Sequence, residues 1–180
     1  MRTRDDKKIY TSYLVLCSVA AAAIITTNIL LGEQTISAEV LKIGERAPDF
    51  KLIDTEKGNI LTKQTFKGKP LFIFFTTTWC TPCQIGAENL DKYDDEKGSS
   101  AFNVLIVFVD EQETDKQFIE WKKKYGRDDW YTAKGVDMAQ KYSAQYLDTK
   151  YVFDKNGVIK WIDIKPLEYS SIEPVLGSLL

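Results

Sequence analysis

Apolar residues occur along the chain in two patterns that predict strands. Continuous apolar runs cover Leu71–Thr76 and Phe102–Asp110 and are typical of strands buried on both faces of a sheet. Four shorter stretches, in which apolar and polar residues alternate, predict two further pairs of strands: Phe50–Ile53, Asn59–Leu61, Lys150–Phe153 and Val158–Ile162. Gly157 supplies the turn of the second pair, which therefore reads as a hairpin.

Apolar positions at helical spacing follow these runs and predict four helices: Thr81–Lys92, Glu113–Tyr125, Val136–Ser143 and Ser171–Leu180. Thr81 and Pro82 suit the first turn of the first helix, and Pro174 suits the first turn of the last one. The order strand, helix, strand, helix, hairpin, helix is that of an α/β fold. We expect residues 43–180 to form one domain.

A different pattern precedes this domain. Residues Tyr13–Leu31 carry no charge and are about long enough to cross a bilayer core of ~30 Å as a helix. Basic residues dominate positions 1–12, which predicts a single-pass anchor with its N-terminus in the cytoplasm and the domain outside. Residues 32–42 then read as a tether. The alternative is a signal peptide that is cleaved near Ala38, which would leave a secreted protein.

Composition narrows the chemistry that is available to the domain. The formal net charge is −2 and no long basic run is present, so no nucleic-acid interface is predicted. The chain has no histidine, which excludes Ser-His and Cys-His catalytic pairs and removes a common metal ligand. Cysteines, carboxylates and lysines remain as candidates.

The strongest motif is WCTPC, in which Cys80 and Cys83 follow Trp79 at the end of a buried strand. Three interpretations are open: a redox pair, a structural disulfide and a metal site. Zinc usually takes four ligands, and a disulfide across so short a loop restricts the unfolded chain little, so redox chemistry is favoured. A thiol at a helix N-terminus has a lowered pKa, and we therefore expect the pKa of the Cys80 thiol to fall below ~8.5.

Three segments resemble the thioredoxin superfamily, and in particular its membrane-anchored TlpA/ResA-like thiol-disulfide oxidoreductases: IGERAPDFKLID, FKGKPLFIFFTTTWCTPC and YVFDKNGVIKW. The resemblance implies a central mixed sheet flanked by helices, with an N-terminal β-hairpin added. It also implies that Cys80 is the nucleophile and Cys83 the resolving cysteine, joined as a disulfide in the oxidised state. No metal or other cofactor is implied.

The resemblance also implies partners. Proteins of this kind act on disulfides in exported proteins, including apocytochromes c during cytochrome c biogenesis and copper-site assembly proteins, and a membrane electron donor recharges them. We expect the same reducing direction here. Around the cysteines, the site is expected to include Trp79, Thr81 and Pro82 from the motif and three residues from the facing loop: Leu147, Asp148 and Thr149.

The chain departs from the family in that facing loop. The superfamily places a cis-proline there, but the position falls at Asp148, and no proline lies between Pro82 and Pro166. Because a non-proline cis bond costs about 3–4 kcal/mol, the Leu147–Asp148 peptide is predicted to be trans, with altered substrate docking. If Asp148 points at Cys80, its charge would raise the pKa of the Cys80 thiol and favour a reducing potential.

A second departure concerns proton transfer to and from Cys83. The positions where relatives carry an internal carboxylate are Phe74 and Gly86 in this chain. Three other carboxylates are candidates to replace them, although each also suits a solvated surface position: Glu88, Asp110 and Glu111.

Two functions other than disulfide exchange fit parts of the sequence. A peroxiredoxin-like peroxidase needs a guanidinium at the cysteine, and the domain has only Arg46 and Arg127, neither within a signature. A thioredoxin-fold copper or metal chaperone, or a partner-binding module, could use Cys80, Cys83 and Asp148. Such chaperones use a C-x-x-x-C motif and a distant histidine, which this chain lacks.

Overall fold

The computed structural model describes residues 40–98 and 101–180. The predicted cytoplasmic segment, the anchor, the cleavage position near Ala38 and most of the tether lie outside these residues. Within the described part of the chain, no helix combines the length and the apolar character that crossing a membrane requires.

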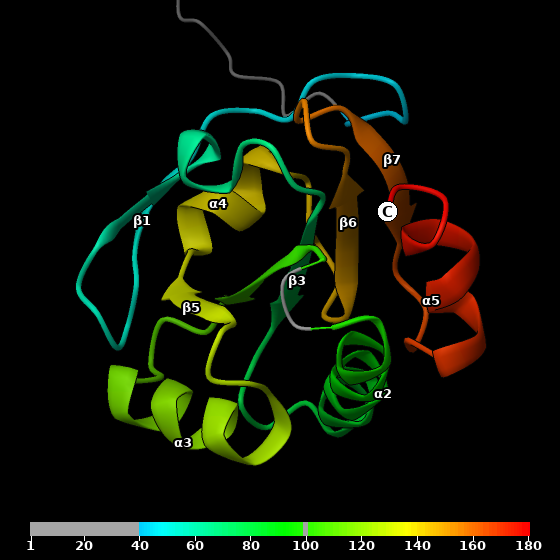
Figure 1. Cartoon of the computed structure of the whole chain (residues 1–180). Helices are drawn as coiled ribbons and strands as arrows, with labels where there is room; N and C mark the ends of the chain where they lie inside the picture. The colour runs from blue at the N-terminus through cyan, green and yellow to red at the C-terminus, as the bar shows by residue number, and fades with distance from the viewer. Residues whose placement is uncertain (1–39, 99–100) are drawn as a thin grey trace, which may run out of the picture. The chain divides into compact units, whose positions relative to one another are not determined.

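A five-stranded mixed sheet forms the centre of the domain, in the order β5-β4-β3-β6-β7 (Figure 1). Its strands are β3 (Leu71–Thr76), β4 (Asn103–Phe108), β5 (Tyr131–Lys134), β6 (Thr149–Phe153) and β7 (Ile159–Asp163). β3 lies in the middle, parallel to β4 and antiparallel to β6. This arrangement confirms the predicted thioredoxin-like α/β fold.

Both faces of the central strand are buried, as its continuous apolar run predicts. Because side chains alternate across a strand, Phe72 and Phe74 enter one core cluster while Ile73 and Phe75 enter the other. Three helices contribute to the first cluster: α2 (Thr81–Lys97), α3 (Asp115–Tyr125) and α5 (Tyr169–Leu176). The sheet is therefore enclosed between two apolar layers.

The second cluster is covered by α4 (Val136–Lys141) and by an N-terminal hairpin of β1 (Lys51–Ile53) and β2 (Ile60–Thr62). Leu52 and Leu61 are paired across this antiparallel hairpin and both are buried. The predicted β-hairpin addition is therefore present. A single 3₁₀ turn, Lys63–Phe66, leads from the hairpin toward β3.

Two features differ from the sequence-based expectation. β5, a four-residue edge strand paired with β4, was not predicted, because so short a run carries little periodic signal. The last helix begins at Tyr169, so Pro174 lies inside it instead of in its first turn. Pro174 is exposed there, and it lacks the N–H that a residue at this position normally donates within the helix.

Candidate active site

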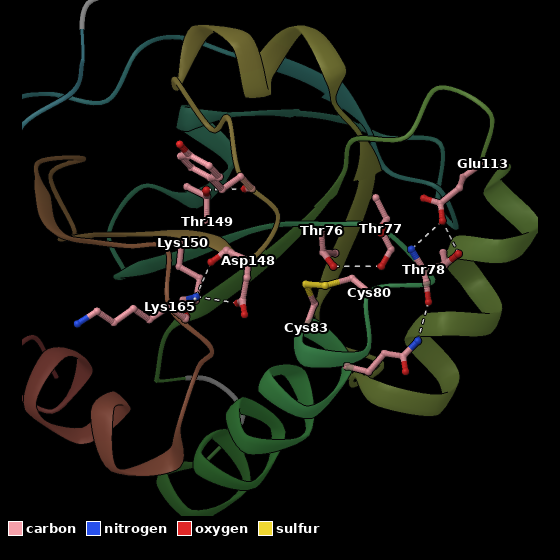
Figure 2. Close-up of a disulfide and its surroundings, with 12 residues drawn as sticks. Thr76, Thr77, Thr78, Cys80, Cys83, Glu113, Asp148, Thr149, Lys150 and Lys165 are labelled. Carbon is pink, nitrogen blue, oxygen red and sulfur yellow. Dashed lines mark hydrogen bonds and ion pairs between the residues drawn. A yellow bond between two sulfur atoms is a disulfide. The ribbon is translucent and has the colours of Figure 1, made fainter.

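The two cysteines lie at the junction between β3 and α2 and form a disulfide, with Cα atoms 5.3 Å apart (Figure 2). Cys80 is the N-cap residue of α2, and its carbonyl accepts a hydrogen bond from the Gln84 N–H at 3.0 Å. Thr81 and Pro82 occupy the first turn and are exposed. Cys80 therefore lies at the N-terminal end of the helix, where unpaired N–H groups stabilise a negative charge such as that of a thiolate.

The two cysteines differ in accessibility. Cys80 keeps 7% of its surface exposed, whereas Cys83, one turn into α2, has 0%. A partner disulfide can therefore reach only Cys80. Cys83 is placed to attack from inside the protein.

Two carboxylates, one buried and one partly exposed, hold the loop that precedes the disulfide. The Thr78 N–H donates to Glu113 Oε1 at 2.7 Å, and the Thr78 hydroxyl donates to the same oxygen. Trp79 is 62% exposed, and its indole N–H donates to Asp110 Oδ2 at 3.1 Å. Glu113 was not among the predicted site residues, because in the sequence it stands near Asp110 and Glu111 and only its burial distinguishes it from them.

The three carboxylates proposed for proton transfer lie on the surface. Glu88 and Glu111 have exposed side chains. The backbone N–H of Gln112 and the indole of Trp79 hold the pKa of Asp110 below its ordinary value. None of the three is a buried group beside Cys83.

The facing loop brings Leu147, Asp148 and Thr149 to the end of the sheet where the disulfide lies. Leu147 packs against the apolar cluster that contains Cys80 and Cys83. Within the described residues no peptide bond is cis, so the Leu147–Asp148 peptide is trans, as predicted. Asp148 has φ +68°, a region that aspartate tolerates better than most residues, and its N–H donates to the Phe75 carbonyl at 3.1 Å.

Asp148 does not present an isolated negative charge, because its Oδ1 lies 2.7 Å from the Nζ of Lys150. Lys150 is fully buried and also donates to the carbonyls of Asp148 and Lys165. The expected effect of a bare aspartate on Cys80 is therefore offset by a cation that sequence reasoning missed. Burial raises the pKa of Asp148, with Lys150 opposing the rise, and burial lowers the pKa of Lys150.

Phe74 and Gly86 occupy the two positions where relatives carry an internal carboxylate, and apolar atoms fill the space between them. Phe74 is fully buried, and a Cβ added at Gly86 would lie 3.5 Å from the Phe74 ring and 3.1 Å from Cβ of Leu167. A larger side chain at Gly86 would require these neighbours to move. The space along this part of α2 is thus occupied by an aromatic ring.

Neither the peroxidase nor the metal-chaperone alternative finds the residues that it needs at the two cysteines. Arg127 binds Asp91 at 3.1 Å and Asp95 at 3.2 Å, and Arg46 donates to the Asn156 carbonyl, so both arginines of the described chain are engaged elsewhere. In residues 40–98 and 101–180, no three histidine, cysteine or acidic side chains gather as a metal site would require. The geometry favours sulfur exchange.

Comparisons with known proteins agree with this geometry. The model of the AhpC/TSA family matches residues 43–162. The thiol-disulfide oxidoreductase ResA of Bacillus thuringiensis subsp. konkukian is 32% identical over 126 residues, which cover 67% of this chain and 69% of that protein. ResA of Geobacillus kaustophilus is 25% identical over 180 residues, 99% of both chains. A putative thiol:disulfide interchange protein DsbE of Chlorobium tepidum shares the fold, with a TM-score of 0.66, 18% identity and coverage of 77% and 98%.

Proposed function

Because the chain belongs to the AhpC/TSA family and is a ResA-like thiol-disulfide oxidoreductase with a Cys80–Cys83 pair, we propose that it reduces disulfides in exported proteins outside the cytoplasm. We further propose that residues Tyr13–Leu31 anchor it in the cell membrane. The observation that carries the reaction is the difference in exposure between Cys80 and Cys83.

In the reducing direction, the reaction begins with the dithiol. The Cys80 thiolate attacks one sulfur of the partner's disulfide and expels the other as a thiolate. Cys83 then attacks Cys80 Sγ, which releases the second partner sulfur and closes the Cys80–Cys83 disulfide. Two electrons pass from the enzyme to the partner, and a membrane electron donor of the kind implied by the family returns the enzyme to the dithiol.

Exposed apolar side chains lie close in sequence to the two cysteines and to the facing loop, and they suit a peptide partner. Trp79 directly precedes Cys80, Ile85 follows Cys83 on α2, and Tyr146 lies two residues before Asp148, with 62%, 55% and 64% of their surfaces exposed. Side chains of this kind bind partner segments through apolar contact area. An unfolded or extended exported protein, such as an apocytochrome c, offers suitable segments around its cysteines.

The proposal is tested by trapping partners in cells. In Cys83→Ser the mixed disulfide with Cys80 is not resolved, so partner proteins should accumulate as covalent complexes that a reductant releases. The matched control is Cys80→Ser/Cys83→Ser, which cannot form the adduct, and both variants carry Cys17→Ser so that no other thiol reacts.

Identification of the released proteins decides the outcome. Exported proteins, apocytochromes c among them, are expected to predominate over cytoplasmic ones. Complexes with cytoplasmic proteins alone would contradict the location, and equal yields from the trap and its control would contradict the role of Cys80.

A further inference from the structure

A buried ion pair lies on the face of the sheet that carries the disulfide. Lys150 is directly opposite Phe74 in the pairing of β6 with β3, and its Nζ lies 5.4 Å from the centroid of the Phe74 ring. Val152, two residues along the same strand, belongs to the apolar cluster that includes Cys80 and Cys83. The Lys150 ammonium is therefore on the α2 side of the sheet.

Asp148 extends from this pair toward the sulfurs. Figure 2 shows its side chain between Lys150 and the Cys80–Cys83 disulfide. Oδ1 is bound by Lys150, but Oδ2 is buried and has no hydrogen-bond partner in the described part of the chain. A buried carboxylate oxygen without a donor is costly, which calls for a functional explanation.

The other carboxylates near the disulfide are committed to different tasks. Glu113 also has a buried oxygen without a hydrogen-bond partner in the described chain, Oε2, but its Oε1 is used to hold the backbone and hydroxyl of Thr78. Asp110 is bound by the Trp79 indole at the surface. With Phe74 and Gly86 apolar, Asp148 is the buried acid that the described site offers to Cys83.

We propose that Asp148 is the proton acceptor for Cys83, directly or through one water, and that Lys150 is the residue that positions it. The inference rests on the proposed function and assigns one of its steps. As the mixed disulfide is resolved, the Cys83 thiol gives its proton to Asp148 Oδ2, and the thiolate attacks Cys80 Sγ. The Cys80–partner bond breaks, the Cys80–Cys83 bond forms, and the partner leaves as a thiolate that takes a proton from water.

Re-reduction of the enzyme uses the same residues in reverse. A donor thiolate attacks Cys80 Sγ, Cys83 leaves as a thiolate, and the protonated Asp148 returns the proton to it. Burial raises the pKa of Asp148 toward that of a thiol, which favours proton exchange, and Lys150 keeps the carboxylate form accessible. Asp163 on β7 lies opposite Lys150 in the pairing of β6 with β7, and its charge also acts on the Asp148–Lys150 pair.

A disulfide reagent with a coloured leaving group separates the two chemical steps. Reaction of the reduced full-length protein with dithiobis(nitrobenzoic acid) releases one thionitrobenzoate when Cys80 attacks and a second when Cys83 resolves the adduct. All variants carry Cys17→Ser, leaving Cys80 and Cys83 as the only thiols of a chain with three cysteines. Stopped-flow absorbance gives both rate constants.

Asp148→Asn is the test variant, because asparagine preserves the shape and tolerates a positive φ. At pH 7 we expect the second release to slow by about 100-fold, while the first release is unchanged. The deficit should shrink as the pH rises past ~8.5, where the thiol loses its proton without help. The matched control is Asp94→Asn, which alters a different buried carboxylate, on α2, and should change neither step.

Lys150→Met/Asp148→Asn separates catalysis from folding. This double variant removes both buried charges together and should resolve as slowly as Asp148→Asn, whatever its stability. A normal second release in Asp148→Asn at pH 7, or a deficit that persists unchanged at high pH, would overturn the relay. A wild-type protein without any second release would overturn the dithiol function itself, so the two failures are distinguishable.

Discussion

Two buried aspartates of this domain look alike until their surroundings are compared. Asp94 on α2 and Asp148 before β6 are 1% and 5% exposed, and each has one bound oxygen and one oxygen without a hydrogen-bond partner in the described chain. Burial raises the pKa of both. By these measures alone, either could be a proton acceptor.

Their partners differ. Asp94 Oδ2 accepts from the Trp130 indole at 2.7 Å and lies 3.7 Å from Nε of Arg127, which also reaches exposed acids. Asp148 instead depends on Lys150, which no solvent reaches. Asp94 is eleven residues past Cys83, about 16 Å along the helix, whereas Figure 2 shows the Asp148 side chain between Lys150 and the disulfide. Burial and a raised pKa therefore do not identify a catalytic carboxylate without its cation and its distance from the reacting atoms.

The sharpest test of this difference is to remove each cation. Lys150→Met leaves Asp148 buried without a counter-charge and should lower the free energy of unfolding by about 3–5 kcal/mol. Arg127→Met should cost about 1 kcal/mol, because Asp94 keeps its bond to Trp130. Urea unfolding of both variants at pH 7 measures the two losses.

The double variant Lys150→Met/Asp148→Asn provides the control for this comparison. With both charges gone, most of the loss caused by Lys150→Met should be recovered. If Lys150→Met and Arg127→Met destabilise the protein equally, the two sites do not differ as the structure indicates.

Glu113 adds a third buried carboxylate, whose role is to hold the loop before the disulfide. Glu113→Ala removes the acceptor of the Thr78 N–H and should cost about 2 kcal/mol in unfolding free energy. Because the loop positions Trp79 and Cys80, both thionitrobenzoate releases should change together, unlike in Asp148→Asn. The exposed Glu111→Ala is the control; a selective loss of the second release in Glu113→Ala would reassign the proton acceptor.

A smaller effect is expected at Asp94, and it depends on pH. Its pKa is raised above 3.8, chiefly by burial, so the folded state holds a proton more tightly than the unfolded state does. The resulting stability is fully present below pH 3.8 and is lost as the pH rises through the raised pKa. Asp94→Asn does not titrate at this position, so its free energy of unfolding should rise relative to that of the wild type as the pH rises. The change in this difference up to pH 7 should be about 1 kcal/mol or less. Unfolding curves recorded at several pH values check the sign, and an opposite trend would contradict it.

Much of the fold and the cysteine pair were predictable because their signals are local. A continuous apolar run, a tryptophan and a proline between two cysteines specify a strand, a turn and a helix start within fifteen residues, Leu71 to Ile85. The final hairpin depends on an equally local turn at Gly157. The trans peptide at Asp148 also followed from one residue type.

The ion pair was not predictable in this way. In TKYVF, the lysine between Thr149 and Tyr151 has a charged side chain, which is typical of an exposed position. In the structure all five residues of the strand are buried. The burial of Lys150 depends on the carbonyl of Lys165, fifteen residues away. The edge strand β5 was missed for a related reason, because its pairing with β4 joins positions as distant as Leu105 and Tyr131.

The smallest effects are expected at the three surface carboxylates that the sequence suggested for proton transfer. Glu88→Gln, Asp110→Asn and Glu111→Gln each remove a charge that water already stabilises, so the second thionitrobenzoate release should stay within about twofold of wild type. Asp110→Asn has a single acceptor oxygen for two donors, the Trp79 indole and the Gln112 N–H, so one of these bonds is lost and any resulting shift of Trp79 should affect both releases alike. A large selective loss of the second release in any of these variants would move proton transfer from the buried pair to the surface, because only a group that accepts the Cys83 proton slows that step alone.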